Sequence, residues 1–327
     1  MQRLLRSVGV APLAAAAISV GIAGVGSAVT TPPTPLSAVG GVVLASLVIA
    51  VGYVSAHEVG TELFPQHRIR LGVADGADFV AVVVGGVLTR WLAVEAALGV
   101  VVASALVGLV AWLVVPERAA AAYCGSFVGM AAPAVLPGYA TVAAAGGVAG
   151  TVFILAAGVY SGFGGKLGAT AFVGCTAVVL GTGAVPTSEP VPHVGTAVGL
   201  TAVAVVAAVL TYVLSVRLAY GPVAASAAVG LAAGGLAPVV FAEGTPVAAV
   251  AFCASFTGMV AESRLPGEPL VGVAGLATGI FFVATTPYFG GFGGKLGAIA
   301  FVGCLATYGL AVLSPWHCIS PRRRRSL

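Results

Sequence analysis

The chain contains only two lysines, Lys166 and Lys295, and both lie in the same heptapeptide, Gly-Phe-Gly-Gly-Lys-Leu-Gly. Positive charge elsewhere comes from 12 arginines, so lysine at these two places is a distinct choice. Lysine is a compact point charge on a flexible stem. A helix that begins beside it adds free N–H groups and partial positive charge, which favour anions. The pattern predicts a binding site for a small solute, and its positive charge indicates an anion.

The predicted site draws on two duplicated motifs, the heptapeptide and Cys-x-Ser-Phe-x-Gly-Met. Its glycines leave backbone amides exposed, its phenylalanines could wall or gate a solute, and its serines could offer hydroxyl groups. No catalytic residue, metal ligand or cofactor is predicted. The predicted substrate-binding residues are Lys166, Lys295, Gly164, Gly165, Gly293, Gly294, Phe163, Phe292, Ser126 and Ser255.

The same motifs have structural interpretations. Lysines near helix ends often reach to the lipid interface as anchors, and glycines often serve close helix packing. A loop that packs the two copies together is a further alternative. For the lysines, duplication of the whole heptapeptide favours the functional interpretation. For Ser126 and Ser255, a packed helix face shared with Gly129 and Gly258 is favoured.

Composition decides the class of protein. Charged residues make up 7% of the 327 residues, against about 25% in soluble domains, and the mean hydropathy is +1.11. A soluble enzyme, a nucleic-acid binder, a coiled coil and a disordered chain are excluded. Uncharged runs such as 97–115 and 194–216 are long enough for membrane helices and do not alternate as barrel strands would. The chain is therefore expected to be an all-α polytopic protein of the cell membrane, with the lipid bilayer as a partner.

Self-comparison indicates a duplication. Residues 124–175 align without gaps on residues 253–304 at an offset of 129, with 27 identities in 52 positions. We assign repeat 1 to 72–186, repeat 2 to 192–315 and a basic tail to 316–327. Each repeat is expected to hold five helical segments: 72–91, 94–115, 119–135, 140–159 and 167–184 in the first, and 194–216, 222–241, 246–261, 270–287 and 296–314 in the second.

Two further helices, 8–29 and 37–56, are expected within residues 1–57, before a polar cytoplasmic loop at 58–71. The first could be a cleaved signal peptide, but its length favours an uncleaved helix. A metal site from His57, Glu62 and His67 matches no zinc spacing.

Charge placement addresses topology. Twelve spanning helices put 12 basic residues inside and 2 outside, and this makes the repeats inverted. If 119–135 and 246–261 are re-entrant, ten helices remain and the split is 10 to 4. Both arrangements leave the two termini cytoplasmic, and the first is favoured.

The acidic residues offer no shared site. Arg90 and Glu95 are expected to pair at a turn, and Glu262 and Glu268 indicate loop divergence between the repeats. No nucleophile or nucleotide motif supports an enzyme. The sequence thus favours a transporter or channel for a small solute. The alternative is a non-transporting scaffold or accessory subunit. A homo-oligomer stays open, and the substrate and its energy coupling are not predicted.

Overall fold

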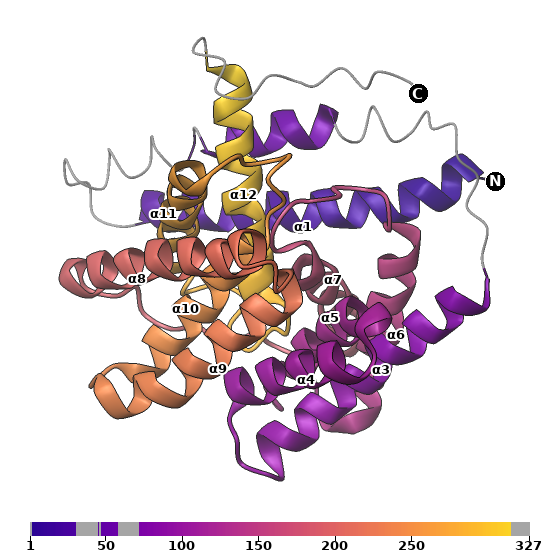
Figure 1. Cartoon of the computed structure of the whole chain (residues 1–327). Helices are drawn as coiled ribbons and strands as arrows, with labels where there is room; N and C mark the ends of the chain where they lie inside the picture. The colour runs from indigo at the N-terminus through magenta and orange to yellow at the C-terminus, as the bar shows by residue number, and fades with distance from the viewer. Residues whose placement is uncertain (1, 31–44, 46, 58–71, 315–327) are drawn as a thin grey trace.

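The computed structural model describes residues 2–30, 45, 47–57 and 72–314. Within these ranges the protein is helical, without strands, and its only bridge of β type joins Thr187 to Gly290. Figure 1 shows the helices gathered in one bundle. The chain begins with α1 (Gln2–Thr30), which contains Pro12, and a second helical stretch covers Leu47–His57. The tail at 316–327 and the loop at 58–71 lie outside the described residues.

The helices of residues 72–186 match the expected segments. They are α3 (Val73–Val94), α4 (Val100–Val114), α5 (Ala119–Gly129), α6 (Gly138–Leu155) and α7 (Lys166–Thr182), with a short 3-10 turn η1 (Pro116–Arg118) before α5. The five segments are confirmed as helices, but α5 stops six residues before the expected end at 135. Pro133 and Pro137 follow it, and proline cannot donate the hydrogen bond that a continuing helix needs.

The helices of residues 192–315 follow the same order. They are α8 (Val194–Tyr212), α9 (Pro222–Val240), α10 (Gly244–Gly258), α11 (Glu268–Ala284) and α12 (Lys295–Leu313), with a π-helical turn η2 (Val213–Arg217) continuing α8. The five expected segments are again confirmed as helices.

Five of the described helices are long and apolar enough to cross a membrane: α3, α6, α8 with η2, α9 and α12. The others are shorter. The 11 residues of α5 extend about 16 Å, roughly half of a 30 Å hydrocarbon core. Nine of the 11 are buried, so this helix is an interior element rather than a free-standing span. Among the residues that the structure describes, length and composition support five membrane-capable helices, whereas 10–12 are expected for the whole chain.

Matching helices make matching contacts in the two halves. In the first, α3 packs on α5 and α6, and α6 packs on α7; in the second, α8 packs on α10 and α11, and α11 packs on α12. The halves meet where α4 contacts α9 and α7 contacts α12, and α1 lies against α6, α7, α11 and α12. The core therefore lies around α5, α7, α10 and α12.

The two halves differ in the hairpins before the duplicated motifs. A methyl group on Gly108 would overlap the ring of Tyr123, and one on Gly230 would overlap the ring of Phe252. The glycines are 122 positions apart, whereas the rings are 129 apart. The second half therefore holds seven more residues here, and α9 and α10 are each four residues longer than α4 and α5.

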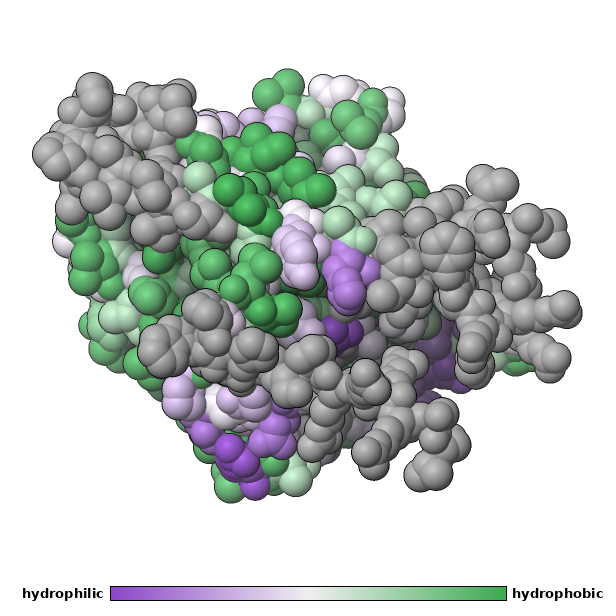
Figure 2. All heavy atoms as spheres, turned by 90° about the horizontal axis from the view of Figure 1, so that it is seen from above, coloured by the Kyte–Doolittle hydropathy of each residue, from purple (hydrophilic) through white to green (hydrophobic). Residues whose placement is uncertain are grey.

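The outer surface is rich in apolar side chains. Large hydrophobic residues such as Leu113, Leu180, Val206 and Leu236 are exposed. Figure 2 shows hydrophobic residues gathered over part of one face, with hydrophilic ones beside them. Exposed apolar patches of this kind mark contact with a membrane or a partner.

Candidate functional site

The two heptapeptides lie in loops that join a helix end to a helix start. The loop 156–165 follows α6 and leads into α7 at Lys166, and the loop 285–294 follows α11 and leads into α12 at Lys295. Gly165 and Gly294 precede these helices with φ of 79° and 80°. This left-handed conformation strains any residue with a Cβ.

Each lysine side chain turns back to the helix before its loop. Lys166 Nζ donates hydrogen bonds to the carbonyls of Ala156 (2.6 Å) and Ala157 (3.2 Å). Lys295 Nζ donates to the carbonyls of Thr285 (2.9 Å) and Tyr288 (2.6 Å). The last carbonyls of a helix lack partners within it and carry partial negative charge. Both ammonium groups therefore bond the C-cap carbonyl of the preceding helix, at Ala156 and Thr285, and Lys295 also bonds Tyr288 within the loop.

The loops also reach across to the opposite half. The carbonyl of Gly162 accepts a hydrogen bond from Ala261 N, and the carbonyl of Gly291 accepts one from Ala132 N, both at 2.8 Å. Between these bonds and the lysines, Gly164 lies against the end of α10 and Gly293 against the end of α5, where a Cβ would overlap backbone carbonyl oxygens. The glycines thus permit contact between backbones of the two halves.

The helices that follow the loops meet in reverse order. A Cβ on Gly165 would overlap Phe301, one on Gly168 would overlap Gly297, and one on Gly294 would overlap Phe172. Residue numbers rise along α7 while they fall along α12, so the first turns of the two helices are antiparallel. The equivalent residues Gly168 and Gly297 lie at the centre of this crossing.

The phenylalanines of the motif lie apart, each on the opposite half. Phe163 packs against Tyr308 of α12, with ring centroids 5.2 Å apart, and Arg264 Cζ lies 4.4 Å from its centroid. Phe292 packs against Phe172 of α7 at 5.6 Å. Both rings therefore contribute to the contact between the halves.

Ser126 and Ser255 are fully buried and bonded to other serines. Ser126 Oγ is 2.8 Å from Ser104 Oγ, and Ser255 Oγ is 2.8 Å from Ser226 Oγ. Ser226 also bonds the hydroxyl of Tyr123 at 3.0 Å, which joins the two halves. These contacts agree with the packing interpretation of the two motif serines.

A cluster of four aromatic rings lies between α5 and α10, and sequence reasoning missed it. Its closest ring centroids are 4.5 Å apart for Tyr123 and Phe127, and 4.6 Å for Phe127 and Phe256 and for Phe252 and Phe256. All four side chains are buried. Phe127 and Phe256 are the phenylalanines of Cys-x-Ser-Phe, so the signal was present in the duplicated motif.

The expected pair of Arg90 and Glu95 is wrong. Arg90 is buried and donates to the carbonyls of the turn after α5, at Gly129, Ala131 and Leu136. Glu95 instead accepts from Tyr139 Oη at 3.1 Å. A guanidinium has five N–H donors, so carbonyls can satisfy a buried arginine without a carboxylate.

Glu262 and Glu268, expected only as signs of loop divergence, both pair with Arg217. Arg217 Nε lies 2.7 Å from Glu268 Oε1, and the nearest contact to Glu262 is 3.5 Å. No group of three metal-ligating side chains occurs among the described residues. Glu62 and His67 of the metal alternative lie outside those residues.

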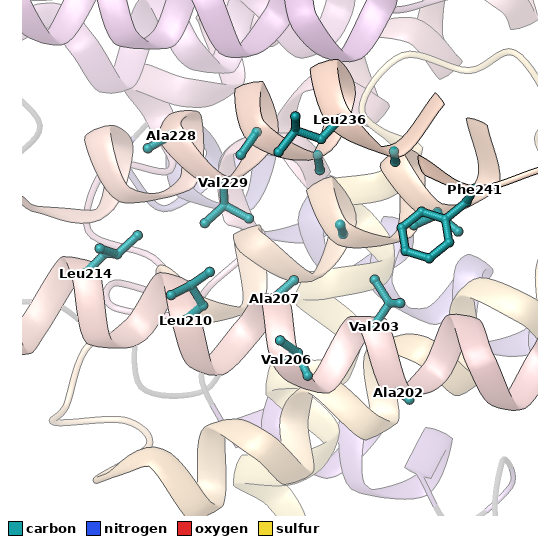
Figure 3. A pocket seen from close by; sticks show the side chains of 15 residues that line it. Ala202, Val203, Val206, Ala207, Leu210, Leu214, Ala228, Val229, Leu236 and Phe241 are labelled. Carbon is teal, nitrogen blue, oxygen red and sulfur yellow. The ribbon is translucent and has the colours of Figure 1, made fainter. Parts of the chain in front are cut away.

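A groove of about 570 Å³ lies between α8, α9 and α10, and no residue of the lysine loops lines it (Figure 3). Its lining is apolar throughout. Comparison of the chain with protein-family models, with curated proteins and with solved structures gives no match. Functional inference therefore depends on the geometry of these sites.

Proposed function

We propose that the protein is a multi-pass membrane transporter or channel for a small anionic solute, built from two inverted halves around the Lys166 and Lys295 loops. The observation that carries this proposal is the antiparallel crossing of α7 and α12 at Gly168 and Gly297. Inverted repeats with helices interrupted near the midplane, and solute sites at those interruptions, are a common plan of secondary transporters.

The contact between α4 and α9 supports inversion independently. Gly230 faces Ala105, and Gly234, further along α9, faces Val101 and Val102, which come earlier in α4. This pair is therefore antiparallel as well. Two equivalent helices that meet antiparallel are related by a two-fold axis perpendicular to both, so one such axis can serve both pairs. If this axis lies in the membrane plane, each half has the opposite orientation.

Inversion has a consequence for the lysines. Lys166 and Lys295 are each two residues from the crossing, which is about 3 Å along the helix. An axis in the membrane plane thus puts both charges near the midplane. Ionisable residues at that depth are costly and usually functional. The adjoining non-helical loops are tolerated there only when buried in protein or lining a cavity.

A scaffold is the second candidate, and a specific observation favours it. Both ammonium groups are already bonded to carbonyls, and the glycines of the motif lie in close contacts between the backbones of the two halves. In this alternative the heptapeptides serve folding alone, and the protein conducts no solute.

Flux measurements on purified protein in liposomes separate the two candidates. The anions tested would be small ones, such as chloride, nitrate, formate and phosphate. Each would be tested with the native chain and with the variants Lys166→Met and Lys295→Met. The control is Arg118→Met, which removes a positive charge that is paired with Asp78 and lies outside the lysine loops. We expect flux of at least one anion above empty liposomes, lost in both lysine variants and kept in the control. Absence of flux for every anion, with folded protein, would support the scaffold.

A further inference from the structure

The groove between α8 and α9 lies in the second half. Its lining is formed by Ala202, Val203, Val206, Ala207, Leu210, Leu214, Ala228, Val229, Ala232, Ala233, Leu236, Ala237, Phe241, Val247 and Ala251. At the offset of 122, Ala228 and Ala232 correspond to Leu106 and Val110 of α4. Small residues on α9 thus leave space that larger residues occupy on α4. Phe241 belongs to the additional stretch of the second half and closes one end (Figure 3).

Water is a poor occupant of this groove. A bound water needs two to four polar partners, and every side chain of the lining is Ala, Val, Leu or Phe. Most backbone groups of α8 and α9 are bonded within their helices; Pro238, inside α9, leaves the Gly234 carbonyl without its helical donor. The physical preference is therefore for a hydrocarbon occupant.

The groove is continuous with the surface that would face lipid. Val206, Leu210 and Leu236 line it and are also exposed on the outside of the molecule. Beyond the groove, Val198 and Val239 continue the same exposed apolar surface. Both flanking helices are long and apolar enough to cross a membrane. A lipid chain could enter sideways without leaving the hydrocarbon layer.

Its dimensions suit one acyl chain. The lining runs along α8 from Ala202 to Leu214, about 18 Å, compared with about 15 Å for one leaflet of the hydrocarbon core. If each carbon of a chain takes about the 30 Å³ share of a water molecule, 16 to 18 carbons need roughly 500 Å³.

We propose that this groove is a binding site for one acyl chain of a membrane phospholipid. Binding of a lipid chain requires that the protein lies in a membrane, but it does not require transport. The lipid site can therefore be tested separately from the proposed transport function.

Native mass spectrometry after exchange into a delipidating detergent tests the site. The double variant Ala228→Leu, Ala232→Val restores the side chains of α4 and fills the groove; the control Val239→Leu, Val240→Leu changes the exposed surface of the same helix. We expect the native chain and the control to retain one phospholipid per chain. In the filled variant, the fraction of chains that carry a phospholipid should fall about tenfold, as expected for an affinity about tenfold weaker. Equal retention in the filled variant would overturn the site.

A cross-linking measurement keeps the test decisive if the filled variant does not fold. A photoreactive phenylalanine analogue at Leu210 would be activated in membranes, with Leu113 on the exposed surface of α4 as the matched position. We expect an adduct of phospholipid mass at Leu210 in several-fold higher yield than at Leu113. Equal yields would mean ordinary lipid contact, and cross-linked chains would mean that a second copy occupies the groove; either result overturns the proposal.

Discussion

The lysine loops and the hairpins before them differ in how closely the two halves of the chain match. The two heptapeptides that end the loops are identical, and each contacts the other half through backbone atoms and glycines. The hairpin α9–α10 is seven residues longer than its counterpart α4–α5, and its outer surface carries a groove. A contact that must fit from both sides tolerates little change, whereas an outer hairpin can lengthen without disturbing the core.

The largest effect is expected at the loops. Gly165→Ala and Gly294→Ala should abolish the folded protein, because each adds a Cβ at a left-handed φ and against backbone of the opposite helix. Overpacking and strain of this kind cost about 1–3 kcal/mol each and more when the backbone cannot move. Size-exclusion chromatography in detergent would measure the folded fraction. Gly199→Ala is the control because nothing lies near its Cβ position, and folded Gly165→Ala protein would contradict the contact.

The lysine variants should come next and should match each other. Lys166→Met and Lys295→Met each remove a charged donor from helix-end carbonyls. Hydrogen bonds to charged groups contribute about 1.5–3 kcal/mol, so the two variants should lower the unfolding free energy by similar amounts. Thermal unfolding in detergent checks this. A large loss in one half only would break the equivalence of the loops.

The serine contacts offer a smaller, unequal effect. Ser226→Ala leaves the buried Tyr123 hydroxyl and Ser255 without this partner, whereas Ser104→Ala affects Ser126 alone, which still donates to the Tyr123 carbonyl. A buried unsatisfied group costs about 1–3 kcal/mol. Ser226→Ala should therefore be the more destabilising variant in chemical unfolding. Equal losses would mean that the link through Tyr123 contributes nothing.

The smallest effect is expected at the surface of the second half. Glu268→Gln weakens an exposed ion pair with Arg217, and such pairs contribute little because solvent screens them. The melting temperature should stay within error of the native value. A clear decrease would show that the turn after η2 depends on this pair.

The sequence predicted the helices well, because long apolar runs and proline-rich turns are local signals. It could not predict what the side chains of Lys166 and Lys295 bind. The motif is equally compatible with hydrogen bonds to backbone carbonyls after the preceding helix and with binding of a solute. The offset of 122 before Cys124 was also missed, although residues 104–109 (SALVGL) and 226–231 (SAAVGL) match at it. The packing of Gly108 and Gly230 on their aromatic rings and the two buried serine pairs show the same offset. Arg90 was assigned to the nearest acid in sequence, but its carbonyl partners are about 40 residues away.

Inversion of the two halves is the central claim, and the turns at Glu117 and Glu243 test it most directly. Both residues are exposed and lie in equivalent hairpins, before α5 and before α10. Cysteines placed there one at a time, in a Cys318→Ser background with the four buried cysteines kept, would be labelled with an impermeant maleimide in intact cells and in inside-out vesicles. Inverted halves predict labelling of the two positions from opposite sides of the membrane. Labelling of both from the same side would contradict the account.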